Sequence, residues 1–267
     1  ESEARWNKGE ARGILDGIPV TVKDIVLSKD WPTQRGSKAS PTDQPHTEDA
    51  PCVARMREHG AIFLGRTATP EFGWKGVTDS PLTGITRNPW DTTKTPGGSS
   101  GGAATAAALG MGALHIGSDG GGSVRIPSGF TGIFGLKPSF GRVPMYPASP
   151  FASLSHIGPM TRTVEDAALM MNALIEPDTR DWFSLPYDPW DYRGGLERGV
   201  RHLRIGFSAN LGYVDVDPEI AQLVADAVKV FEDLGAHVEA IDPGFENPLD
   251  CFNKHWYAGA YRLVETF

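Results

Sequence analysis

Two glycine-rich segments, each of which carries a serine, are the feature that most constrains this chain. Residues 95–102 read Thr-Pro-Gly-Gly-Ser-Ser-Gly-Gly, and residues 117–123 read Gly-Ser-Asp-Gly-Gly-Gly-Ser. Glycine has no Cβ, so backbone amides in such segments can approach one reacting atom and adopt dihedral angles that other residues avoid. The pair therefore indicates loops held at a site by a folded scaffold.

The composition is that of an ordinary globular protein. Of the 267 residues, 40% are hydrophobic and 22% are charged, enough for one large domain or two small ones. The formal net charge is −8 and there is no basic run, which argues against nucleic acid or an anionic membrane as a partner. No apolar run approaches the ~20 residues of a membrane helix. Cys52 and Cys251 lack metal-ligand spacing, which favours a reducing, cytoplasmic location without disulfides.

The pattern of apolar residues predicts alternating strands and helices. The expected strands are Ile18–Val26, Ala61–Arg66 and Leu114–Ser118, and the expected helices are Thr47–His59, Ala103–Leu109 and a third from Thr163 to about Leu174. A strand–helix–strand unit is expected at Leu203–Phe207, Pro218–Leu234 and His237–Ile241. Asp217 is the expected N-cap of its helix, and the spacing favours parallel strands. This alternation predicts a large mixed sheet covered by helices.

The first glycine segment has an ordinary explanation as a flexible linker. It leads directly into the alanine-rich helix, however, so its amides can lie at a helix N-terminus, where negative charge is favoured. Gly97–Gly101 also matches the Gly-x-Ser-x-Gly nucleophile elbow, which requires an apolar strand immediately before it. The preceding residues 88–96 are polar and rich in proline, so the elbow is disfavoured.

The second segment reads as a turn or as an oxyanion hole, in which consecutive amides converge beside a nucleophile. It is no nucleotide-binding loop, because no Gly-Lys-Ser or Gly-Lys-Thr follows. Asp119 and Arg125 flank it, and we expect a salt bridge between them that holds the loop.

Lys23 lies in the run Gly-Ile-Pro-Val-Thr-Val-Lys-Asp. A lone lysine is more often solvated, but its β-branched neighbours predict burial, which disfavours the ammonium form and lowers the pKa. Two glycine loops with serines and such a lysine indicate a serine hydrolase with lysine as the base. His115 and His156 are competing bases, but neither has the context of a catalytic triad. No pair of histidines or cysteines has metal-ligand spacing on one element.

At this point the residues resemble a known family, the amidase signature family of serine amidases. The matching blocks, in the family's order and spacing, are residues 17–24, 95–102, 117–127, 135–138 and 154–164. The resemblance implies an α/β/α sandwich around a large mixed sheet. It also implies that residues 1–267 are part of a single domain, strongest over 13–175, with N-terminal helices and a C-terminal third or more lying outside this chain.

The resemblance assigns roles residue by residue. Ser123 corresponds to the nucleophile, Ser99 to a second serine on a cis peptide bond after Gly98, and Lys23 to the base. Four amides would form the oxyanion hole: those of Gly120, Gly121, Gly122 and Ser123. The supporting residues would be Gly98, Ser100, Asp119 and Arg125. The family's chemistry needs no metal and no organic cofactor.

The resemblance implies hydrolysis of a small-molecule amide through an acyl-enzyme. An alternative within the family is the amidotransferase A subunit, which makes ammonia from glutamine for misacylated tRNA. Such members usually carry glutamine after the arginine and Lys-Asp-Asn near the base, where this chain has Ile126 and Ile25.

Gly120 stands where many relatives have threonine or isoleucine, which leaves the loop freer. A non-catalytic scaffold is a third alternative. The sequence leaves the oligomeric state open, with a homodimer as one option.

Overall fold

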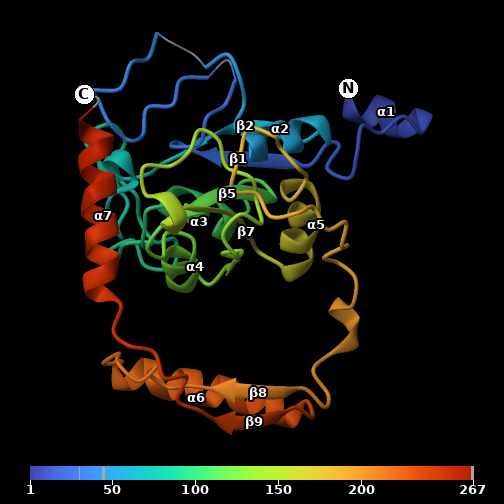
Figure 1. The fold of residues 1–267 in the computed structure, drawn as a ribbon. Coiled ribbons are helices and arrows are strands. Elements are labelled where there is room, and N and C mark those ends of the chain that lie inside the picture. The colour runs from blue at the N-terminus through green and yellow to red at the C-terminus, as the bar shows by residue number, and fades with distance from the viewer. Residues whose placement is uncertain (30, 44–45, 266–267) are drawn as a thin grey trace. The chain divides into compact units, whose positions relative to one another are not determined.

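A mixed five-stranded sheet forms the centre of the larger part of the molecule. The computed structural model describes residues 1–29, 31–43 and 46–265. The strands lie in the order β2–β1–β5–β7–β6 (Figure 1). Their bounds are β1 Pro19–Lys23, β2 Ile62–Thr67, β5 Leu114–Asp119, β6 Phe134–Gly135 and β7 His156–Thr161. β1 is parallel to β2 and β5, whereas β7 is antiparallel to β5 and β6, which confirms the predicted mixed sheet.

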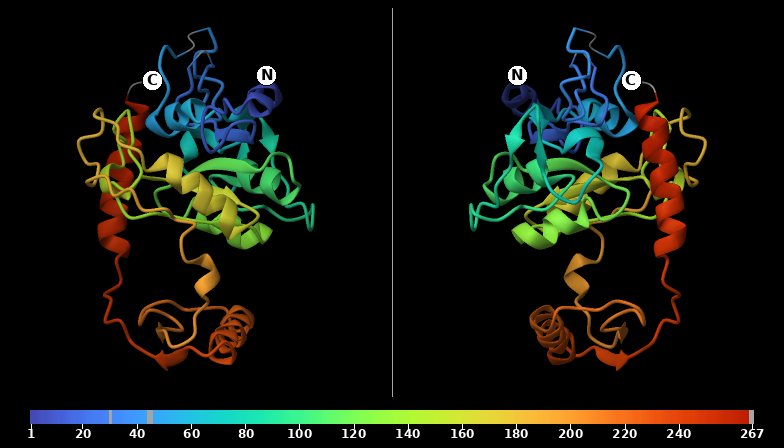
Figure 2. Two further views of the ribbon diagram at one scale, coloured as in Figure 1. Left: turned by 90° about the vertical axis from the view of Figure 1, so that its right-hand side faces the viewer. Right: turned by 90° about the vertical axis from the view of Figure 1, so that its left-hand side faces the viewer.

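Helices cover both faces of this sheet (Figure 1, Figure 2). They are α2 Pro51–Glu58, α3 Gly101–Ala108, α4 Arg125–Thr131 and α5 Val164–Leu174. Val20 and Val22 of β1 pack in one core with α2 and α5. Successive side chains of a strand point to opposite faces, so Thr21 and Lys23 face the other layer, where α3 packs with Met160. The α/β/α sandwich is confirmed.

The strand that carries Lys23 is shorter than the predicted Ile18–Val26. It ends at Lys23, because the amides of Ile25 and Val26 turn back and donate to the Lys23 carbonyl, at 2.8 and 3.0 Å. This turn places Lys23 at the carboxyl end of a buried parallel strand.

The helix expected from Thr47 begins instead at Pro51. Proline is favoured in the first turn because its fixed φ suits a helix, and it holds the residue before it in an extended conformation. Ala50 has φ −60° and ψ 152° accordingly, so Thr47 is not the cap. The expected end near His59 is confirmed, and Gly60 follows with φ 84°.

The connection between β2 and α3 contains three short regular elements. They are the 3₁₀ turn η1 Glu71–Gly73 and the hairpin strands β3 Asp79–Ser80 and β4 Gly84–Ile85. A further 3₁₀ turn, η2 Ala152–Leu154, precedes β7. At the N-terminus, α1 Ser2–Lys8 is fixed by Arg5, which donates two hydrogen bonds to the carboxylate of Asp16.

Residues 194–256 form a second compact unit, and residues from Tyr257 onward belong to the first. The second unit holds η3 Leu196–Arg198, β8 Arg204–Phe207, α6 Pro218–Asp233, β9 His237–Ala240 and the beginning of α7 Leu249–Val264. β8 and β9 are parallel and α6 contacts β9, as the predicted strand–helix–strand unit requires. The Asp217 side chain caps α6 by accepting from the Glu219 amide at 2.9 Å.

Candidate active site

Lys23 is fully buried, and its amine meets two hydroxyl groups. The Nζ atom lies 2.6 Å from Ser99 Oγ and 3.0 Å from Ser118 Oγ. β1 ends at Lys23 beside β5, and Ser118 comes near the end of β5, so both groups lie at the carboxyl end of neighbouring parallel strands. Ligands of α/β proteins characteristically bind at this end of the strands.

Burial lowers the pKa of Lys23 to about 7, because the ammonium loses its hydration inside the protein. The negative charge of Asp119 acts in the opposite direction and favours the protonated form. A large fraction of the amine is therefore uncharged near neutral pH. An uncharged amine within 2.6 Å of a hydroxyl oxygen can accept its proton.

Ser99 lies in a loop that has no room for larger residues. The Gly98–Ser99 peptide bond is cis, as the resemblance implies. A methyl group placed on Gly98 would lie 2.6 Å from the backbone of Val77, so only glycine fits there. Thr78 binds the same loop by donating from its hydroxyl to the Gly97 carbonyl at 2.9 Å. Ser99 itself is only 2% exposed.

Backbone and side-chain contacts join the two serine loops. The Ser100 amide donates to the Ser123 carbonyl at 3.2 Å, and the Ser100 hydroxyl donates to the Ser118 carbonyl at 3.2 Å. Ser100 thus contacts both segments, and its supporting role stays a prediction. Ser99 and Ser123 are both described by the structure, and no hydrogen bond joins their hydroxyl groups. The structure thus forms the Lys23–Ser99 contact directly and brings Ser123 beside it through the backbone.

Asp119 organises the second glycine loop. Its carboxylate, almost completely buried, accepts two hydrogen bonds from the Arg125 guanidinium, both at 2.9 Å, so the expected salt bridge is formed. It also accepts from the amides of Gly122 at 2.7 Å and Val124 at 3.1 Å. Burial alone would raise the pKa of Asp119, but the hydrogen bonds from Arg125 and these amides outweigh it and lower the pKa to about 2.

One consequence concerns the expected oxyanion hole. The Gly122 amide points at Asp119 and is already hydrogen-bonded, so it is not free to receive an oxyanion. Within the described part of the chain, the amides of Gly120, Gly121 and Ser123 have no such partner. The oxyanion hole of Gly120, Gly121, Gly122 and Ser123 stays a prediction, in which Gly122 is the amide that already has a partner inside the protein.

Ser118 is the residue that the sequence analysis missed. It lies inside the block Gly117-Ser-Asp-Gly, whose glycines and nearby Ser123 carry the stronger sequence signal. The available signal was its place near the end of a strand predicted beside that of Lys23. Pairing between those two strands was not evident from the sequence, because register depends on tertiary contacts.

Neither competing histidine contacts the serines. His115 is fully buried, shares a 2.8 Å hydrogen bond with Thr21 Oγ1, and has its pKa lowered to about 4 by burial. The His156 ring binds the Leu154 and Asp119 carbonyls, at 2.8 and 3.2 Å. All of these residues are described, and no hydrogen bond links either ring to Ser99 or Ser123. His115 is a core histidine that stays uncharged.

Apolar side chains surround the serine loops. A methyl group placed on Gly73 would lie 3.4 Å from Ile25 Cδ1 and 3.5 Å from Ser99 Oγ. The Ile126 side chain packs so closely on Gly97 and Gly122 that a Cβ at either position would lie within about 3 Å of it. Ile126 thus contacts both loops at once.

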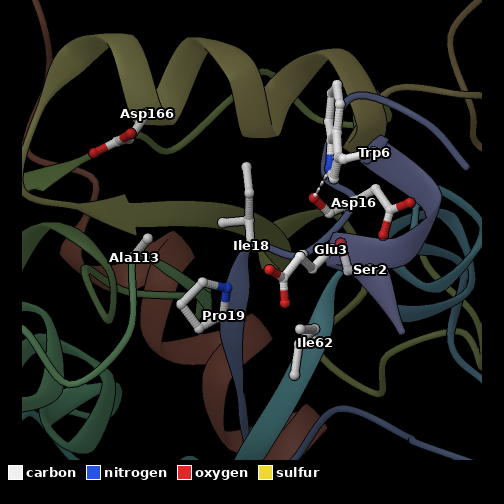
Figure 3. A pocket seen from close by; sticks show the side chains of 10 residues that line it. Ser2, Glu3, Trp6, Asp16, Ile18, Pro19, Ile62, Ala113 and Asp166 are labelled. Carbon is white, nitrogen blue, oxygen red and sulfur yellow. Dashed lines mark hydrogen bonds between the residues drawn. The ribbon is translucent and has the colours of Figure 1, made fainter. Parts of the chain in front are cut away.

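A separate pocket of about 640 Å³ lies at the opposite end of the strands (Figure 3). It is lined by α1 and by residues at the amino ends of β1, β2 and β5, namely Ile18, Pro19, Ile62 and Ala113. Trp6 closes one side by donating from its indole to the Asp16 carbonyl at 3.0 Å. This pocket contains none of the candidate catalytic residues.

Comparison with known proteins agrees with this geometry. The sequence profile of the Amidase family matches residues 1–264. The chain belongs to the amidase family. It is 44% identical to an acylamidase of Rhodococcus erythropolis over 99% of this chain and 56% of that protein. It is 40% identical to the A subunit of the glutamyl-tRNA(Gln) amidotransferase of Gloeobacter violaceus over 94% of this chain and 51% of that protein.

The solved structures show the same membership. A bacterial aryl acylamidase of the amidase signature family superposes with a TM-score of 0.88 and 36% identity, over 99% of this chain and 55% of that chain. The chain thus spans about half the length of the amidases that it matches. Over residues 1–29, 31–43 and 46–265, the helices are too short or too polar to cross a membrane.

Proposed function

We propose that this amidase hydrolyses a small-molecule carboxylic amide, with Ser123 as the nucleophile and Lys23 as the base acting through Ser99. The observation that carries the proposal is the 2.6 Å contact between a fully buried lysine amine and Ser99, in a loop bonded to that of Ser123. Burial of Lys23 supports its role because only the uncharged amine can take a proton.

The first step forms an acyl-enzyme. Ser123 Oγ attacks the amide carbonyl, its proton passes to Ser99, and the proton of Ser99 passes to Lys23. This relay requires the Ser123 hydroxyl to turn toward Ser99, which the backbone bond between Ser100 and Ser123 keeps close. The C–N bond then breaks as the proton returns through Ser99 to the leaving nitrogen, and ammonia or an amine departs.

The second step regenerates the enzyme. Water attacks the ester on Ser123 and gives its proton to the same relay, which returns a proton to Ser123 Oγ and releases the acid. In both steps the negative oxygen would bind the amides of Gly120, Gly121 and Ser123. Loss of one donor of this kind costs about 3–4 kcal/mol in comparable enzymes. Asp119 and Arg125 would act only by holding the loop.

The similarity to an acylamidase and to an aryl acylamidase structure supports hydrolysis of an amide. We infer that the enzyme works in a reducing compartment such as the cytoplasm, since Cys52 and Cys251 are both free thiols.

The test combines product release with labelling. The protein is incubated with aliphatic and aromatic amides, ammonia or amine is measured, and a serine-directed acylating probe is mapped by mass spectrometry. We expect release from amides, and labelling at Ser123 that Ser123→Ala abolishes. Ser80→Ala is the matched control, because Ser80 bonds Thr83 in the β3–β4 hairpin and not the site. Labelling at another serine, or substantial turnover by Ser123→Ala, would contradict the proposal.

The glutamine-dependent amidotransferase is the second candidate, favoured by the 40% identity to the corresponding protein of Gloeobacter violaceus. This function predicts that glutamine is the only amide from which ammonia is released, and that the release requires partner proteins. A folded protein that releases nothing from any amide or ester would instead favour a non-catalytic scaffold.

A further inference from the structure

Two aromatic side chains meet beside the candidate site. The rings of Trp74 and Tyr257 have centroids 6.4 Å apart and are tilted by 50° to each other. Both side chains are partly exposed, with 43% of Trp74 and 61% of Tyr257 accessible to solvent. Ligand sites are lined largely by apolar and aromatic side chains with a few polar groups, so an aromatic pair next to Ser99 is a candidate ligand contact.

Trp74 lies close to Ser99 in the fold, because the residue before it, Gly73, packs beside the Ser99 hydroxyl. Gly73 is the glycine whose added methyl group would lie 3.5 Å from Ser99 Oγ. The turn that holds Gly73 is fixed from outside, because the Phe72 amide donates to the Arg35 carbonyl at 2.7 Å and Ser37 donates to the Glu71 carboxylate at 2.8 Å. The position of Trp74 relative to Ser99 is therefore set by structure and not by a loose loop.

The position of Tyr257 is fixed by a close contact of its helix, α7. Gly259, two residues later in α7, packs so closely on Phe151 that a Cβ there would lie 2.6 Å from the Phe151 ring. Gly259 is the one buried residue of α7 within its described length. This contact anchors the helix and leaves the Tyr257 ring beside Trp74.

The segment that carries Trp74 lies among apolar side chains and a neutralised ion pair. Ile25 lies between Gly73 and the end of β1, and Ile126 reaches within 3.9 Å of a methyl group placed on Gly76. Lys75, next to Trp74, forms a 2.9 Å ion pair with Asp79, so their charges cancel locally. Flat apolar groups gain both buried area and ring–ring contacts in such a setting.

We propose that Trp74 and Tyr257 form an aromatic subsite that binds a flat apolar ring of the substrate, which makes an aryl amide the preferred substrate class. This rests on the proposed amide hydrolysis. The ring is attached to either the acyl carbon or the amide nitrogen, and the two attachments are distinguished by experiment.

The experiment compares three amides: benzamide carries its ring on the acyl side, acetanilide carries it on the nitrogen, and propionamide has no ring. The measured quantity is kcat/KM for each aryl amide divided by that for propionamide. We expect Trp74→Ala to lower this ratio at least about tenfold for one of the two aryl amides, with Tyr257→Ala lowering it less. Trp74→Phe should restore most of the ratio, because it keeps an aromatic ring. The aryl amide whose kcat/KM ratio falls more in Trp74→Ala identifies the side of the substrate that the pair contacts.

Trp182→Ala is the matched control, since Trp182 is 94% exposed and should leave both ratios unchanged. Ratios that stay unchanged in Trp74→Ala would overturn the subsite. Binding of benzamide and acetanilide to the Ser123→Ala protein, followed by calorimetry, separates this proposal from the proposed function. If no amide is hydrolysed, the function fails; a dissociation constant raised about tenfold by Trp74→Ala still supports the subsite, and unchanged constants for both compounds overturn it.

Discussion

Lys23 reaches Ser99 at 2.6 Å from a position that has no exposure to solvent. This combination matters because a buried amine loses its proton more easily, and because a single hydrogen bond links the amine to Ser99 of the proposed relay. Burial lowers its pKa to about 7, within the range where enzymes work.

The pH dependence of activity should report this amine. If uncharged Lys23 is the base, kcat/KM rises with pH and levels off above an apparent pKa near 7. A stopped assay between pH 5 and 9 measures the profile, and Lys23→Ala should lower the plateau by orders of magnitude. If Lys23→Ala keeps a near-normal rate and the same rise of kcat/KM with pH, another group is the base.

Stability should depend on pH through the same residue. The pKa of Lys23 is about 7 when folded against 10.5 as the ordinary value, so the unfolded chain binds more protons between these two pH values. Lys23 therefore costs stability below pH 7, and this cost disappears as pH rises toward 10.5. Lys23→Met removes the charge, so its gain in the free energy of unfolding should be largest below pH 7.

Urea unfolding of both proteins at several pH values measures this difference. Each pKa unit corresponds to about 1.4 kcal/mol, which sets an upper limit of a few kcal/mol on the gain. A gain that grows with rising pH would have the wrong sign and would refute burial of the ammonium as the cause.

Ser118 should matter for rate although it is no part of the relay. Its hydroxyl holds Lys23 at 3.0 Å, so Ser118→Ala frees the amine to move away from Ser99. We expect kcat to fall about tenfold, the worth of one hydrogen bond to a charged or reacting group, with KM little changed. Ser118→Thr keeps a hydroxyl and should recover most of the rate. Equal rates for the alanine variant and the parent would remove Ser118 from the site.

Asp119 should control the geometry of the glycine loop. Asp119→Asn removes the charge that pairs with Arg125 and one acceptor for the amides of Gly122 and Val124. We expect kcat to drop about 10²-fold, together with a lower melting temperature. Asp178→Asn is the control, because it breaks a comparable bidentate pair with Arg180 away from the serines. Equal losses of kcat in the two variants would indicate general destabilisation.

The two thiols should differ in reactivity. Burial raises the pKa of Cys52 to about 12, whereas Cys251 is exposed in α7. A thiol reagent at pH 8 should modify Cys251 rapidly and Cys52 only after denaturation. Cys251→Ser provides the check, since the native variant should then show almost no reactive thiol. Fast labelling of Cys52 in the native protein would contradict its burial.

Much of the fold followed from local pattern. The alternation of apolar residues predicted the strands and helices around Lys23 and Ser99, and polar residues such as Thr163 and Asp217 marked helix starts that the structure confirms. Two predicted boundaries were wrong, because a neighbouring residue or turn favoured another start or end of the element. Pro51 displaced Thr47 as the helix start, and the turn after Lys23 ended a strand that β-branched residues would otherwise have continued.

The sequence by itself determined which chemical groups are present and in what order: an amine in an apolar strand, serines in glycine loops, and the family to which these blocks belong. Only the tertiary structure decided that the Lys23 amine bonds both Ser99 and Ser118. It also decided that the Gly122 amide donates to Asp119 and that Tyr257 lies beside Trp74. The physical reason is that local patterns specify single elements, whereas contacts between distant residues depend on strand register and on how loops pack.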